Sequence, residues 1–274
     1  MKNIVLFTIV CALITLLSCN KKNAENTNLT GEIIKEWRIL VKNDFINPSP
    51  SNRSDTGELI LQVTDRNNLT YQYNITGLQN SDFINGAGLY AGDPLTNGAR
   101  LIDFAPRPSP AYGSRSIYNL RQSLVDSMLN SNVDLYFMAT STQHPTGLVR
   151  AQLNTTVVFA ADLPLSGLNE VPPVTTTATG LSSLRITSNR ILYSKIVISN
   201  MEVNDMATMA HIHTGAPGAN GPVIVPLVSV PAEFGVVRKF TLTEAQYNSV
   251  LKDRTYVNVH STLFPAGKVR GQIR

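Results

Sequence analysis

The chain contains many short segments in which apolar and polar residues alternate, separated by clusters of glycine, proline and asparagine. Alternation with a period of two predicts β-strands that bury one face, and its regular recurrence predicts an all-β sandwich or barrel. In the C-terminal half the predicted strands span residues 156–161, 181–187, 191–199, 208–214, 223–228, 236–242, 256–261 and 268–273.

This arrangement occurs twice in the chain. The sequence T-G-E-L-I-L-Q-V-T from Thr56 matches T-G-L-S-S-L-R-I-T from Thr179, a shift of 123 residues. Near the ends of the two copies the shift is 120 residues, because P-T-G-L-V-R-A-Q from Pro145 matches P-A-G-K-V-R-G-Q from Pro265. A fixed internal period indicates a duplicated structural unit. We therefore expect two tandem immunoglobulin-like or Greek-key domains, spanning 31–154 and 155–274.

Each domain is expected to contain one short helix. The sequence T-E-A-Q from Thr243 has the spacing of a capping box and predicts a helix that continues to about Leu251. Its longer counterpart in the first domain is predicted from Ser116 to about Asn130.

The N-terminus has the pattern of an export signal. Residues 4–17 form an apolar run of 14 residues, which is too short to span a bilayer comfortably but suits a signal peptide. The run ends in L-L-S-C, which resembles the lipobox of bacterial lipoproteins. That resemblance implies a signal peptide over 1–18, lipidation of Cys19 and a flexible tether over 19–30. It also implies attachment to the cell envelope through a lipid, and Asn20 after the cysteine favours the outer membrane.

The composition is that of an ordered globular protein, with 43% hydrophobic and 15% charged residues. A formal net charge of +4 without a dense run of basic residues argues against nucleic acid as a partner. The second cysteine, Cys11, lies within the predicted signal peptide. Stability must therefore come from packing, because Cys19 alone cannot form an intramolecular disulfide.

Three of the four histidines occupy matching positions on two predicted strands. In A-H-I-H-T the side chains of His211 and His213 lie on one face, about 6.6 Å apart along the strand, while Ala210 and Ile212 form the core face. His260 likewise follows an alternating segment and lies outward. If the two strands are neighbours, the three imidazoles can converge on the outer face.

Three neutral imidazoles suit copper or zinc. Glu170, in the sequence N-E-V-P-P, is a candidate fourth ligand or a group that orients a ligand, and the alternative is a carboxylate that is only solvated. The histidines have an alternative as well, which is to bind the G-A-P-G-A-N-G loop from Gly215 and stiffen the end of the barrel without a metal. Arg270, and Arg150 at the matching position, are expected to form structural salt bridges.

Three motifs in the second copy, L-S-G-L-N-E-V-P-P-V from Leu165, A-H-I-H-T-G-A-P-G-A-N-G-P-V-I from Ala210 and Y-V-N-V-H-S-T-L-F-P-A-G-K-V-R-G-Q-I from Tyr256, resemble the CHRD domain of chordin and of many bacterial secreted proteins. The resemblance implies an immunoglobulin-like β-barrel and no catalytic activity. The first copy resembles the family only through the internal repeat. It has Gly88, Tyr90 and Thr140 where the second copy has its three histidines.

A further resemblance concerns short motifs only. The H-x-H strand, the later V-x-V-H strand and the final G-x-x-R segment are similar to the copper half of copper-zinc superoxide dismutase. A dismutase of that type also needs a bridging histidine and a zinc site, yet no histidine lies between His213 and His260. Nucleophile-elbow and phosphate-loop motifs are absent from the sequence.

The sequence therefore predicts a non-enzymatic lipoprotein of the cell envelope whose tandem domains bind an unknown protein or surface ligand. The alternative is an envelope protein that holds copper or zinc at His211, His213 and His260, with superoxide-dismutase-like redox activity as its extreme form.

Overall fold

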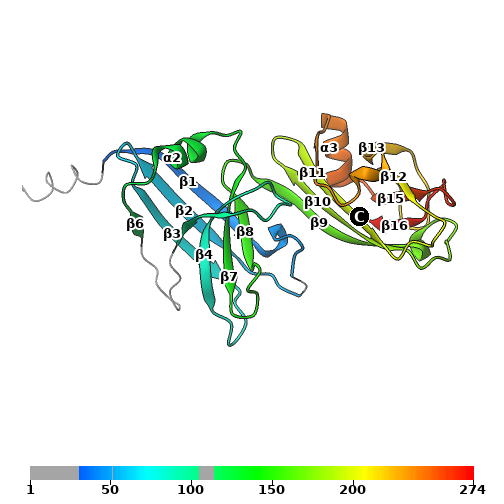
Figure 1. Ribbon diagram of the computed structural model, residues 1–274, viewed down its shortest axis with the longest axis horizontal. Coiled ribbons are helices and arrows are strands. Elements are labelled where there is room, and N and C mark those ends of the chain that lie inside the picture. The colour runs from blue at the N-terminus through cyan, green and yellow to red at the C-terminus, as the bar shows by residue number, and fades with distance from the viewer. Residues whose placement is uncertain (1–30, 51, 105–113) are drawn as a thin grey trace, which may run out of the picture.

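The computed structural model describes residues 31–50, 52–104 and 114–274. The predicted signal peptide, Cys19 and the tether lie outside these residues. Within the described residues the protein is all-β, with sixteen strands in two eight-stranded antiparallel sheets and two short α-helices (Figure 1). The all-β fold class is thereby confirmed. No helix in the described part of the chain is long and apolar enough to cross a bilayer.

Each sheet is built from one copy of the sequence repeat. The elements of the first copy are β1 (Ile33–Lys42), η1 (Asn43–Phe45), β2 (Thr56–Thr64), β3 (Leu69–Thr76), β4 (Ile84–Ala91), β5 (Arg100–Asp103), β6 (Arg115–Ile117), α2 (Gln122–Leu129), β7 (Leu135–Ser141) and β8 (Val149–Gln152). Those of the second copy are β9 (Val157–Ser166), η2 (Gly167–Asn169), β10 (Thr179–Thr187), β11 (Ile191–Ser199), β12 (Ala207–Thr214), β13 (Val223–Val228), η3 (Pro231–Glu233), β14 (Arg238–Thr241), α3 (Glu244–Lys252), β15 (Thr255–Ser261) and β16 (Val269–Gln272).

The two sheets have the same topology. The strand order is β5-β4-β7-β8-β1-β2-β3-β6 in the first and β13-β12-β15-β16-β9-β10-β11-β14 in the second. Each strand of the second sheet thus occupies the place of the strand eight earlier in the first. In both sheets the fourth strand crosses over to pair with the seventh, which places β12 beside β15.

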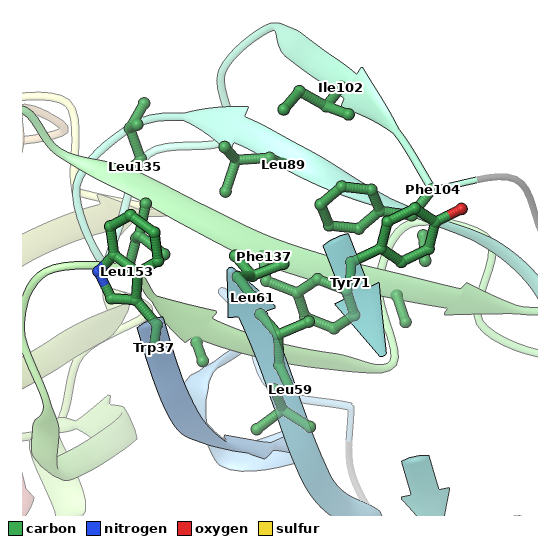
Figure 2. Packing of buried hydrophobic residues seen from close by; sticks show 14 of the residues in the cluster. Trp37, Leu59, Leu61, Tyr71, Leu89, Ile102, Phe104, Leu135, Phe137 and Leu153 are labelled. Carbon is green, nitrogen blue, oxygen red and sulfur yellow. The ribbon is translucent and has the colours of Figure 1, made fainter. Parts of the chain in front are cut away.

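The core of the first copy is rich in aromatic side chains (Figure 2). The rings of Tyr71 and Phe104 stack with their centroids 4.4 Å apart, and Phe137 lies 6.0 Å from Phe104 on the other side. Trp37 is buried in the same cluster. Such aromatic pairs add about 0.5–1.5 kcal/mol beyond the area that they bury.

The second copy has a separate core. Its buried apolar cluster draws only on residues between Leu165 and Val269, whereas the first cluster draws only on residues between Trp37 and Leu153. The two copies also touch: the Arg185 guanidinium pairs with Asp162 at 2.9 Å and donates a hydrogen bond to the backbone carbonyl of Ile46. Arg185 retains its partner Asp162 when the copies are separated.

We therefore expect residues 155–274 to fold alone as a cooperative β domain. The reason is that its strands, its helix and its core all come from this segment. Circular dichroism of the isolated fragment should show a β spectrum and a single sigmoidal thermal transition. A fragment that stays unfolded while the full mature chain folds would show that the two copies depend on a shared core.

The two predicted helices have different outcomes. In the second copy, α3 begins after Thr243, whose side chain accepts a hydrogen bond from the backbone N–H of Gln246 in a complete capping box. In the first copy the prediction of a helix from Ser116 was wrong, because α2 begins only at Gln122. Ser116 belongs to β6, which pairs with β3 as β14 pairs with β11.

Candidate metal centre

The three histidines lie on neighbouring antiparallel strands. On β12, Ala210 and Ile212 are fully buried in the core, so His211 and His213 lie on the opposite face. The register of β12 and β15 pairs His213 with Tyr256 across the strands, and His260 lies four residues farther along β15 on the same face. Strand alternation and strand pairing together bring the three rings to one face, as the sequence predicted.

The three rings are close enough to share one ion. One donor nitrogen from each of His211, His213 and His260 can be chosen so that all lie within 4.8 Å of one another. The closest pair is His211 Nδ1 and His260 Nε2, at 3.0 Å. Two ligand atoms at about 2.0–2.1 Å from a tetrahedral or trigonal ion lie roughly 3.3–3.6 Å apart. Small ring rotations therefore suffice to form a three-nitrogen site.

This face of the sheet is more enclosed than the sequence suggested. His213 is 8% exposed and His260 is 9% exposed, whereas His211 is only partly buried. The His213 Nδ1 atom lies 3.0 Å from the carbonyl oxygen of Gly221, in the loop after β12, and the His260 Nδ1 atom lies 2.9 Å from that of Pro265. These loop contacts exclude water from much of the site.

Those carbonyl contacts fix the tautomer of two rings. A carbonyl oxygen only accepts, so Nδ1 carries the proton in His213 and His260, and each Nε2 presents a lone pair; that of His260 faces His211 Nδ1. The Nε2 atom of His213 is buried and has no hydrogen-bond partner in the described part of the chain. A buried polar atom without a partner typically costs about 1–3 kcal/mol. The loop-bracing role and the metal-binding role are thus compatible, since each uses a different nitrogen.

All three imidazoles favour the neutral form that binds metals. Burial lowers the pKa of His211 to about 4, and the adjacent His260 and His213 rings act in the same direction. Burial also lowers the pKa of His213 and of His260, against the opposing effect of their carbonyl partners. Near neutral pH the site therefore presents lone pairs without first losing protons.

An aromatic stack borders the site, because Tyr256 is paired with His213 across the strands. The His213 ring lies parallel to the Tyr256 ring at a centroid distance of 4.9 Å, and the Arg270 guanidinium lies 3.4 Å from the Tyr256 ring centre. Arg270 donates hydrogen bonds to the Ala216 carbonyl and to Gln272. The role of Arg270 is structural, but the predicted salt bridge is wrong: its partners are an aromatic ring and neutral oxygens.

The CHRD domain profile matches this chain twice, over residues 39–153 and 162–273. The chain belongs to the CHRD family. Neither the comparison with curated proteins nor that with solved structures finds a match. The two sheets described above are thus two tandem CHRD domains, and the three histidines belong to the second.

Glu170 of the second CHRD domain is buried next to this site. It is only 5% exposed, so the alternative of a solvated carboxylate does not hold. Its Oε2 atom accepts a hydrogen bond from Asn258, which is paired with His211 across the strands, and its Oε1 atom is buried without a partner. Burial raises the pKa of Glu170 to about 7, and Arg270 opposes this rise. Among the described residues the donor atoms within 4.8 Å come from the histidines.

The first CHRD domain keeps the scaffold of this face without its chemistry. Arg150 lies 3.4 Å from the centre of the Tyr136 ring, as Arg270 does over Tyr256. Register places Gly88, Tyr90 and Thr140 at the histidine positions. Ile46 is the residue of the first domain that matches Glu170, since each directly follows the 3-10 helix after the first strand of its domain. Met138 occupies the position that matches Asn258. The first domain therefore has none of the five residues that form the site in the second domain, which are His211, His213, His260, Glu170 and Asn258.

Sequence reasoning missed a buried ion pair next to the His260 hairpin. Asp205 lies 2.7 Å from Lys268 Nζ and also accepts hydrogen bonds from the hydroxyls of Ser261 and Thr262. The first domain has a matching group, in which Asp82 binds Ser141 and Thr142 and pairs with Arg53. The signal was the recurrence of Asp82 as Asp205 at the shift of 123 residues, each with a Ser-Thr pair downstream.

Proposed function

We propose that this protein is a cell-envelope lipoprotein whose tandem CHRD domains form a binding module, and that its second domain binds one copper or zinc ion. The ligands are His211, His213 and His260. One observation carries the proposal: one imidazole nitrogen from each of the three histidines lies within 4.8 Å of the others, and the His213 ring also has a buried Nε2 atom with no partner among the described residues. An imidazole nitrogen that is left unpaired in a folded protein is suited to a ligand that supplies the missing bond.

The site is largely preorganised for an ion. His213 and His260 are already oriented by their carbonyl contacts, in the way that outer hydrogen bonds orient metal-binding histidines. Without an ion, His211 Nδ1 donates its hydrogen to His260 Nε2. To bind an ion, His211 offers Nδ1 and carries its proton on Nε2 instead. This change of tautomer needs no net release of protons.

Metal titration of the chain from Lys21 onward tests the proposal. Copper(I), copper(II) and zinc are titrated separately, and bound metal is measured after removal of free ions. We expect about one ion per chain, and no tight binding when all three histidines are replaced by alanine. His144 is the matched control, because it lies outside the site. Equal binding by the wild type and the triple variant would contradict the proposal.

The lipid anchor is tested separately. Cys19→Ser removes the only residue that can carry the lipid in the lipobox sequence L-L-S-C. We expect the variant to leave the membrane fraction or to keep its signal peptide, which a mobility shift on gels would reveal. Unchanged fractionation and processing would rule out lipidation, and the metal proposal would be unaffected.

A further inference from the structure

Met209 lies beside two of the three histidines, His211 and His260. It precedes His211 by two residues on β12, so its side chain lies on the same face of the strand. The register of β12 and β15 pairs Met209 with His260. Side chains that are directly opposite on antiparallel strands have Cβ atoms roughly 4.5–5.5 Å apart. The Met209 thioether is therefore within reach of the ion-binding nitrogens.

The site opens to solvent on the side of Met209. Along β12 the exposure falls from 41% for Met209 to partial burial for His211 and to 8% for His213. The large exposed hydrophobic side chains also include that of Met206, at 53%. Met209 is an exposed methionine on the same strand face as His211, and in the first CHRD domain the matching position is Gly86.

The fourth position of the site is not filled by a carboxylate. Glu170 accepts a hydrogen bond from Asn258, and among the described residues the donor set drawn from histidine, cysteine and carboxylate side chains contains the three histidines alone. An uncharged set of three imidazoles and one thioether adds no negative charge to the ion. Imidazole suits both copper and zinc, whereas a thioether selects copper(I) because both are soft.

We propose that the ion is copper(I) and that the Met209 sulfur is its fourth ligand, at the solvent side of the site. This inference rests on the proposed metal-binding function and specifies the ion. Met209 then gives the site its preference for copper(I) over zinc, and it is the first ligand that an incoming ion meets.

Two leucine variants test the assignment. Met209→Leu removes the sulfur with little change in volume, and Met206→Leu is the matched control. Met206 is a similarly exposed methionine that lies opposite Thr262, two residues beyond His260. Copper(I) affinity is measured in ascorbate by competition with bicinchoninate, and zinc affinity with a chromogenic chelator. We expect Met209→Leu to weaken copper(I) binding by at least about 10-fold, the smallest loss typical of groups that only orient a ligand, with zinc binding unchanged. Met206→Leu leaves both affinities unchanged.

X-ray absorption provides an independent readout. With selenomethionine in place of methionine, the copper edge should show one selenium neighbour in the wild type and none in Met209→Leu. Unchanged copper(I) affinity in Met209→Leu together with copper bound only by nitrogen would overturn the role of Met209, while the three-histidine site would stand. An equal loss in Met206→Leu would also overturn it. If the wild type binds no copper or zinc, the proposed function itself fails.

Discussion

Replacing His211 by alanine should reduce the affinity of the protein for copper or zinc by more than about 100-fold, since a ligand contributes more than the groups that merely orient it. His211 is the most informative of the three positions. Its ring contacts the other two histidines, whereas His213 and His260 also bind backbone carbonyls, so their replacement disturbs loops as well. The His211→Ala variant should therefore keep its fold, which circular dichroism can verify.

His144→Ala provides the control for this prediction, and we expect it to leave metal affinity unchanged.

The pH dependence of metal affinity provides a second measurement. Free histidine has a pKa near 6.5, which would predict weaker binding below about pH 6. Because burial lowers the pKa of His211 to about 4, we expect affinity to change little down to about pH 6 and to fall as the pH approaches 4. A steep loss between pH 7 and 6 would contradict the buried site.

The metal-free protein should also lose stability in that acid range. The folded pKa of His211 lies below its unfolded value, so between about pH 6.5 and 4 the unfolded chain binds a proton that the folded chain does not. Acid therefore favours unfolding over this window, with no effect above it. Metal affinities below pH 5 must be compared with unfolding curves at the same pH.

The second large effect concerns Asp205. Replacing it by alanine removes the buried partner of Lys268 and four further hydrogen bonds, from the hydroxyls of Ser261 and Thr262 and from the backbone N–H groups of Met206 and Leu263. Loss of one member of a buried ion pair typically costs about 3–5 kcal/mol. We expect the free energy of unfolding of the second domain to fall by that amount, although Glu202 remains beside Lys268.

The single tryptophan of the chain allows the unfolding of the first domain to be measured separately. Trp37 is buried in the core of the first domain, so its fluorescence follows that domain alone, whereas circular dichroism follows both. In Asp205→Ala the dichroism transition should move and the fluorescence transition should not. The matched change Asp82→Ala should shift the fluorescence transition instead. A loss below about 1 kcal/mol in Asp205→Ala would show that the pair contributes little.

Much of the fold could be predicted from alternation and repetition. The predicted strands 191–199 and 223–228 coincide with β11 and β13, because each is bounded by turn residues. Strand β9 extends to Ser166, beyond its predicted end at 161. The extension includes Pro164, which is tolerated because the edge of β9 away from β10 is nearly unpaired: β16 pairs with β9 only at Ser166.

The sequence was sufficient to predict which histidines form the candidate site, but not how deeply they are buried. Spacing alone placed His211 and His213 on one face, opposite Ala210. Their burial depends on the loop that folds over this face and on the Gly221 carbonyl, which a strand pattern does not encode. The buried Glu170 depends on a chain segment nearly ninety residues from its partner Asn258, and so no local pattern could reveal it.

The buried acids Asp205 and Asp82 also bear on how a duplicated protein evolves. Their cations come from different places: Lys268 lies just before β16, whereas Arg53 lies before β2, and Leu148 occupies the position of Lys268 in the first domain. Recombination between the repeats could exchange the β15–β16 hairpin for the β7–β8 hairpin. Asp205 would then lose the cation Lys268, whereas Asp82 would keep Arg53 and gain a lysine as a second cation. The two domains have the same topology, but their different ion pairs make these hairpins incompatible with exchange between the domains.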